Sequence, residues 1–125
     1  MKKIEKENKT FESIKHIDEN GTEFWYAREI MNIFEYSKWQ NFEKIIEKAR
    51  ISCENSEISA FEHFTNVGKT IKMPKGAEKE INDYKLTRYA CYLIAQNGDP
   101  RKEVMALAQT YFAVQTRKQE ITERE

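Results

Sequence analysis

Apolar positions follow two different periods along this chain, and the first period is that of a strand. Residues 11–17 and 23–27 each read as a short extended segment, and Asn20–Gly21 lies between them. An Asn-Gly pair between two such segments is typical of a tight hairpin turn. The pattern therefore predicts a β-hairpin near the N-terminus.

After residue 27 the apolar spacing becomes helical. Residues 27–36 predict a short helix, and residues 38–55 predict a longer helix with Ser37 as its N-cap. Apolar residues recur at helical spacing in the longer segment: Trp39, Phe42, Ile45, Ile46 and Ala49. Residues 54–66 keep no steady period, so we expect a loop with one helical turn around Phe61–Phe64.

The second half of the chain predicts another hairpin and two helices. Residues 69–73 and 80–84 flank Pro74–Gly76, which indicates a hairpin with a lysine-rich rim. Residues 88–97 form the next predicted helix, and Thr87 is placed to cap it.

The stretch Gly98–Lys102 is expected to join that helix to the last one. Gly98 suits the left-handed position after a helix end, Asp99 suits an N-cap, and Pro100 suits the first helical position. The last helix is then expected to run to about Gln119. Its predicted buried stripe contains Val104, Leu107, Ala108 and Tyr111.

Together these elements predict an α+β fold: one predominantly helical domain with two small β-hairpins. The 125 residues suffice for a single modest core. We expect residues 1–10 to be a flexible N-terminus, residues 11–119 to be the domain, and residues 120–125 to be a charged tail.

Composition favours a cytoplasmic protein. No apolar run approaches the roughly 18 residues that span a bilayer, and the N-terminus lacks the apolar segment of a secretory signal. Cys53 and Cys91 have neither metal-site nor disulfide-framework spacing, so both thiols are expected to be free. The formal net charge is zero, with 10 basic and 13 acidic residues in positions 1–66, and 11 and 8 in positions 67–125. Anion binding would therefore depend on local geometry.

No motif for catalysis, a cofactor or a metal is present. The chain lacks the glycine-rich phosphate loops, the zinc-protease motif and the paired-cysteine motif that would indicate such chemistry. His16 and His63 are too few to build a metal site by themselves. We therefore expect a non-enzymatic protein without a cofactor.

Two cations stand where the last helix is expected to begin. Arg101 and Lys102 oppose the positive end of a helix dipole there, at a cost of up to about 1 kcal/mol. A phosphate bound by the helix amides and by both cations would offset that cost. The alternative is that both side chains pair with Asp99, Glu103 or a carboxylate of a neighbouring element.

The predicted second hairpin and its flank form another basic cluster. Its cations are Lys69, Lys72, Lys75, Lys79, Lys85 and Arg88, and its acids are Glu78, Glu80 and Asp83. Basic side chains on a hairpin could contact a nucleic-acid backbone. They could equally protect a strand edge from aggregation.

Aromatic residues are the third candidate. Phe24 and Tyr26 fall on one face of a predicted strand and Trp25 falls on the other, because side chains alternate along a strand. Trp39, beside Lys38, could stack an exposed base. Aromatic residues at helical spacing more often pack in a core, so both interpretations stay open.

Two long runs carry a family resemblance: FWYAREIMNIFEYSKWQNFEKIIEKA and DYKLTRYACYLIAQNGDPRKEVMALAQTYFAVQTRKQE. They resemble the bacterial DNA-damage-inducible protein D family over residues 11–119. They are similar, more distantly, to the Bro amino-terminal domain of phage antirepressors and large DNA viruses. The resemblance implies a mixed α and β domain usually assigned to DNA binding, and a bacterial cytoplasmic setting in the DNA-damage (SOS) response. The family has no agreed catalytic set. The resemblance also implies a longer protein that continues beyond the charged tail, because family members usually extend well past this position.

These observations lead to one leading hypothesis and one alternative. The leading hypothesis is a non-enzymatic module that binds single- or double-stranded DNA. Its predicted phosphate contacts are Lys72, Lys75, Lys79, Arg88, Arg101 and Lys102. The alternative is a protein-interaction module that acts on a recombinase filament, or that self-associates through Phe112 and Val114 on the last helix. Both hypotheses assign the protein no membrane contact.

Overall fold

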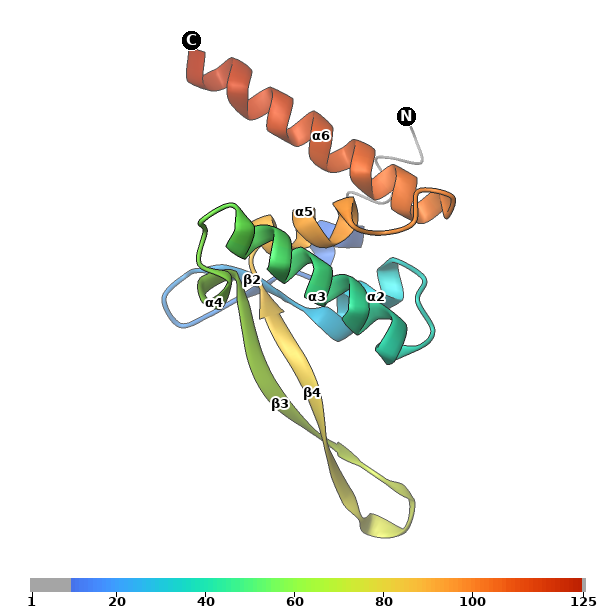
Figure 1. The fold of residues 1–125 in the computed structure, drawn as a ribbon. Helices are drawn as coiled ribbons and strands as arrows, with labels where there is room; N and C mark the ends of the chain where they lie inside the picture. The colour runs from blue at the N-terminus through green and yellow to red at the C-terminus, as the bar shows by residue number, and fades with distance from the viewer. Residues whose placement is uncertain (1–9, 125) are drawn as a thin grey trace.

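A computed structural model of the chain describes the backbone of residues 10–124 and the side chains of residues 10–118. The described part is an α+β domain in which helices cover one side of a four-stranded antiparallel sheet, with strand order β1-β2-β4-β3 (Figure 1). The strands are β1 (His16–Ile17), β2 (Glu23–Tyr26), β3 (Phe64–Lys72) and β4 (Glu78–Leu86). The helices are α2 (Ala27–Ile33), α3 (Trp39–Asn55), α4 (Ala60–His63), α5 (Arg88–Gln96) and α6 (Glu103–Arg124), with a short 3-10 turn, η1 (Pro74–Gly76).

The N-terminal hairpin is shorter than predicted. Residues 10–13 are helical, and β1 is the part of the predicted first strand that pairs with β2. Tertiary packing explains the difference, because Phe11 is buried and stacks on Trp25 with ring centroids 4.5 Å apart. The indole Nε1 of Trp25 donates a hydrogen bond to the carbonyl of Phe11 (2.9 Å). Residues 1–9 of the segment predicted to be flexible lie outside the described residues.

The two faces of the sheet differ as the alternation in β2 predicts. Trp25 is fully buried, and its neighbours across the sheet on the same face, Leu86 and Phe64, are buried as well. This inner face packs against α5, and Trp39 of α3 stacks on Tyr84 of β4. The core cluster includes Phe42, Ile46, Ala90, Ile94 and Met105. Phe24 and Tyr26 are half-buried and do not belong to that cluster, so they lie on the outer face.

The second hairpin is much longer than predicted. β3 and β4 pair continuously from Phe64 opposite Leu86 to Lys72 opposite Glu78, so residues expected in a loop belong to a strand. Lys75 and Gly76 turn the chain at the tip, with φ of 70° and 80°. The distal half of the hairpin projects beyond the helices (Figure 1). The prediction of a small second hairpin was therefore wrong in size. Both hairpins belong to the same sheet.

Helix ends follow the predictions in part. The hydroxyl of Thr87 accepts a hydrogen bond from the amide of Ala90 (3.1 Å), which confirms Thr87 as the cap of α5. Ser37 was wrongly predicted as the cap of α3, because the N-cap is Lys38. Gly98 does not adopt the predicted left-handed conformation. A side chain there would instead collide with the methyl end of Met105, which is fully buried.

The last helix starts later and ends later than predicted. α6 begins at Glu103 and continues to Arg124. Five of the six residues assigned to a charged tail, residues 120–124, are therefore helical. Phe112 is buried against Phe11 and Tyr92. Phe112 is absent from the predicted buried stripe of the last helix, but in the structure this residue belongs to the core.

Candidate nucleic-acid interface

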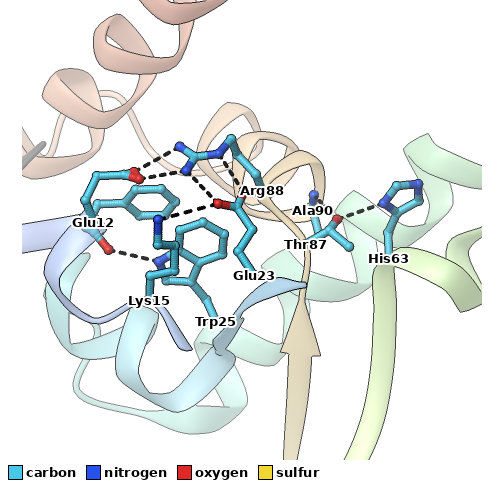
Figure 2. Close-up of polar contacts among 9 residues, drawn as sticks. Glu12, Lys15, Glu23, Trp25, His63, Thr87, Arg88 and Ala90 are labelled. Atoms are coloured by element: carbon cyan, nitrogen blue, oxygen red, sulfur yellow. Dashed lines mark hydrogen bonds and ion pairs between the residues drawn. The ribbon is translucent and has the colours of Figure 1, made fainter. Parts of the chain in front are cut away.

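Arg88, one of the predicted phosphate contacts, is held in an internal network at the start of α5 (Figure 2). Its guanidinium donates to both oxygens of Glu12 (3.0 and 2.7 Å) and to both oxygens of Glu23 (2.9 and 3.1 Å). It also lies 5.1 Å from the ring centroid of Trp25. Lys15 approaches the same Glu23 carboxylate at 3.7 Å. This network connects the helical turn at residues 10–13, β2 and α5.

The network also favours the charged forms of Arg88 and Glu23. Hydrogen bonds to Glu12, followed by those to Glu23, raise the pKa of Arg88 further above its ordinary value despite partial burial. Hydrogen bonds from Arg88 hold the pKa of Glu23 below its ordinary value. Two carboxylates therefore neutralise Arg88 in the folded protein. This geometry does not support the predicted phosphate contact at Arg88, because a phosphate would have to displace both acids.

Arg101 is also paired locally. The chain between α5 and α6 is a turn, in which the amide of Lys102 donates to the carbonyl of Asp99 (3.1 Å). Pro100 therefore does not occupy the first helical position, and Asp99 does not cap α6, which begins at Glu103. Nε of Arg101 lies 3.0 and 3.1 Å from the two carboxylate oxygens of Asp99. The alternative interpretation of Arg101, pairing with Asp99, is the one that the geometry favours.

Lys102 connects the same turn to the segment between α2 and α3. Its Nζ donates to the carbonyl of Glu35 (2.8 Å) and lies 3.8 Å from the ring centroid of Tyr36. Glu35 has a positive φ of 59°, so the ammonium group contacts a tight turn. Lys102 thus has a structural role in this conformation. The α5–α6 turn also lies far from the hairpin tip, so the six predicted cations do not converge (Figure 1).

The hairpin lysines have different surroundings. Lys72, Lys75 and Lys79 are exposed. None of them forms an ion pair or hydrogen bond with another described residue. Their ammonium groups are therefore available to an anion. Of the predicted site, the structure leaves these three side chains open.

Strand register sorts the hairpin charges onto two faces. Partners across antiparallel strands lie on the same face, and neighbours along a strand alternate between faces. Lys69 pairs with Ile81, Lys79 with Ile71, and Lys85 with Thr65, and all of these lie on the outer face. Glu78 and Glu80 lie on the opposite face with Lys72. The paired strands β3 and β4 are called the ribbon below, and its outer face thus carries three lysines.

Asp83 is the acid of β4 that could weaken this positive field, but it is buried. One carboxylate oxygen of Asp83 accepts hydrogen bonds from the amides of Arg28 (3.1 Å) and Tyr84 (2.8 Å). Arg28 is the second residue of α2, so Asp83 supplies the cap that Tyr26, the N-cap residue, lacks. The Asp83 side chain therefore lies inside the fold, and the ribbon presents no exposed carboxylate on its outer face.

The lysines adjoin an aromatic cluster on the same outer face. Tyr26 pairs with Lys85 across β2 and β4, and His16 pairs with Phe24 across β1 and β2. The rings of His16, Phe24 and Tyr26 lie 4.9–5.4 Å apart by their centroids. Alternation in the sequence predicted the shared face of Phe24 and Tyr26. It did not indicate that Lys69 and Lys85 would lie beside them, because this depends on the pairing of β2 with β4.

Other kinds of site find less support in the part of the chain that the structure describes. No cluster of three or more His, Cys, Asp or Glu side chains could hold a metal there. Trp39 packs against Tyr84 and lies under Arg28, which favours its structural interpretation over base stacking. Cys53 and Cys91 are free thiols, as expected, and both are buried. No described helix is long and apolar enough to cross a membrane.

Fold and surface together define a small α+β domain that displays a basic β-ribbon. The chain belongs to the BRO family, N-terminal domain, whose family model matches residues 13–113. It is 44% identical over 115 residues to the DNA damage-inducible protein D of Escherichia coli (strain K12). The alignment covers 92% of this chain and 42% of that relative, so the chain spans less than half of the relative's length. No solved structure matches the chain.

Proposed function

We propose that this domain is a DNA-binding module of a bacterial DNA-damage response. Family membership and the name of the E. coli relative support the damage-response setting. The proposal places the module in the cytoplasm and assigns it no catalysis. The observation that carries the proposal is the outer face of the β3–β4 ribbon. Lys69, Lys79 and Lys85 project there without an exposed carboxylate, and Lys75 lies at the tip.

The proposed contacts are to phosphates. An ammonium group is a compact point charge that binds a phosphate oxygen without reading the base sequence. Arg88 and Arg101, whose planar guanidinium groups would suit two-point contacts, are already paired with carboxylates. We therefore propose lysine-dominated binding that tolerates any sequence and weakens steeply with salt. Lys72 is expected to contribute less, because Glu78 lies directly opposite on the same face.

A salt titration of a charge-reversal variant tests this proposal. The variant replaces Lys69, Lys75 and Lys79 with Glu, and its affinity for a labelled oligonucleotide is measured between low and moderate salt by fluorescence anisotropy. Because each phosphate contact contributes about a tenfold factor near 0.1 M salt, we expect a loss of about 100-fold or more and a shallower salt dependence.

The matched control changes the same amount of charge elsewhere. Lys38, Lys44 and Lys48 are exposed on the N-cap and body of α3, which packs on the inner side of the sheet. Their replacement by Glu should leave most of the affinity in place. Equal losses in the two triple variants would indicate a response to net charge alone and would remove the ribbon as the site.

Exposed apolar side chains on α3, on α4 and in the connection between them support a second candidate function, that of a protein-interaction module. Phe61 on α4 is 82% exposed, and Ile51 and Ile58, on α3 and in the connection to α4, are 49% and 37% exposed. A recombinase filament is the partner that this candidate would contact. Phe61→Ser should then abolish co-sedimentation with the filament but retain oligonucleotide binding. Retained co-sedimentation would argue against this surface.

Self-association through the last helix is less well supported. Phe112 is buried within the domain, and Val114 is 37% exposed on α6. Sedimentation equilibrium of Val114→Asp against the unmodified chain tests whether this residue contributes to a dimer.

A further inference from the structure

The outer face of the sheet carries three rings that the hydrophobic core does not use. His16 lies 5.4 Å from Phe24 in a stacked arrangement and 4.9 Å from Tyr26 edge-on, and Phe24 and Tyr26 meet edge-on at 5.3 Å. All three are half-buried, and neither Phe24 nor Tyr26 packs against the core. Partly open aromatic faces on a sheet are the surfaces on which unpaired bases stack.

Two of the ribbon lysines lie over these rings. Nζ of Lys85 is 4.8 Å from the ring centroid of Phe24, and Nζ of Lys69 is 5.9 Å from that of Tyr26. Each ammonium group thus occupies the approach to a ring face in the free protein. The attraction of a solvent-accessible ammonium group to a ring is weak, so a ligand can displace it at little cost.

We propose that Phe24 and Tyr26 stack unpaired bases of single-stranded DNA while Lys69 and Lys85 move from the rings to the adjacent phosphates. The inference rests on the proposed function and extends it to strand preference. Charge and ring chemistry support this one occupant, since a polynucleotide supplies both a flat apolar partner for each ring and an anion for each ammonium group. A duplex supplies the phosphates but keeps its bases inside.

The rings of Phe24 and Tyr26 form the proposed stacking platform. His16 is expected to position this platform and not to contact the DNA strand. Its Nε2 lies 2.7 Å from Oε1 of Glu29 on α2, so the imidazole is tied to a helix. Its ring in turn supports Phe24 and Tyr26. Glu29 is the neighbouring acid of the platform, and its carboxyl group is engaged by the imidazole of His16.

The test compares oligomers that differ only in their bases. A thymidine oligonucleotide and an abasic oligomer of the same length carry the same phosphates, and a duplex of that length is the third probe. Because stacking of one base on an aromatic side chain is worth about 1–3 kcal/mol, the thymidine strand should bind about tenfold tighter or more than either other probe. Equal affinity for the thymidine and abasic strands would overturn the inference.

Variants locate the effect. Phe24→Leu with Tyr26→Leu should abolish the preference for bases, and Tyr26→Phe should retain it because the ring remains. Tyr89→Leu, at a half-buried tyrosine on α5, is the matched control and should retain the preference. If the double variant Phe24→Leu with Tyr26→Leu keeps the preference for bases, these rings are excluded as the stacking site. Melting curves of each variant show whether the fold is intact.

The two proposals fail in different ways. If the lysine triple variant binds every probe as well as the unmodified chain does, the proposed phosphate contacts are wrong. If that variant loses affinity for all probes but the unmodified chain does not distinguish abasic from thymidine strands, the phosphate contacts stand and the stacking platform is wrong. The comparison of probes needs no variant, so an unstable double mutant does not prevent the test.

Discussion

Cations at the helical end of the molecule and cations on the β3–β4 ribbon carry the same formal charge but meet different surroundings. Arg88 is held by Glu12 and Glu23 through four hydrogen bonds. Arg101 is paired with Asp99. The ribbon lysines project from two strands that place the local acids on the other face or inside the fold. A positive residue therefore offers a binding site only where the fold leaves it without a carboxylate.

The difference also separates two kinds of free energy. A paired arginine contributes to folding stability, and its charge is already compensated for any ligand. An unpaired surface lysine contributes little to folding and retains its full charge for binding. Four predictions test this division, beginning with the one that has the largest expected effect on stability.

Replacement of Arg88 by Met should destabilise the domain by about 2 kcal/mol. Met keeps the packing of an unbranched side chain but leaves two facing carboxylates without their donor. The loss is no larger than this because the Arg88 side chain is 39% exposed and solvent screens the pair. Urea denaturation at neutral pH measures the change. Oligonucleotide affinity should stay the same, and a selective loss of affinity would return Arg88 to the binding site.

Acid should weaken the same network. Arg88 holds the pKa of Glu23 below its ordinary value of 4.5, so the stabilisation is complete above that pH and is lost as pH falls through the lower folded-state value. The difference in unfolding free energy between the unmodified chain and Glu23→Gln should be constant from pH 7 to about pH 5 and shrink below. A difference that grows on acidification would contradict this role of Glu23.

Replacement of Lys102 by Met should cost about 1 kcal/mol or less. The change removes one hydrogen bond to the carbonyl of Glu35 and one contact with the ring of Tyr36, both on a partly exposed turn. Thermal melting measures the loss, and Lys102→Arg should recover part of it. Lower oligonucleotide affinity with unchanged melting would show that Lys102 binds phosphate.

The smallest effect on stability is expected from neutralisation of one exposed cation in each region. Arg101, with a 90% exposed side chain, and Lys75, at the ribbon tip, should each tolerate Gln with little change in the free energy of unfolding. Binding should distinguish them. Lys75→Gln is expected to reduce the salt slope by about one, whereas Arg101→Gln leaves it unchanged. Equal slopes would remove Lys75 from the proposed site.

Local patterns along the chain predicted much of the fold. Helical spacing located α3 and α5, Thr87 was identified as a cap, and alternation placed Trp25 on the face opposite to Phe24 and Tyr26. Each of these features depends on residues a few positions apart. The length of β3 was missed because its polar outer residues have no clear period, and their pairing with β4 supplies the order.

The candidate site could be predicted only in part for the same reason. The sequence alone identified a lysine-rich hairpin and an α+β domain, because composition and periodicity are local properties of the chain. Tertiary structure decided which cations remain available. Arg88 meets Glu12 and Glu23 from 76 and 65 positions away, and β2 pairs with β4 to bring Tyr26 beside Lys85. Compensation of a charge depends on distance in space, which folding sets and sequence separation does not reveal.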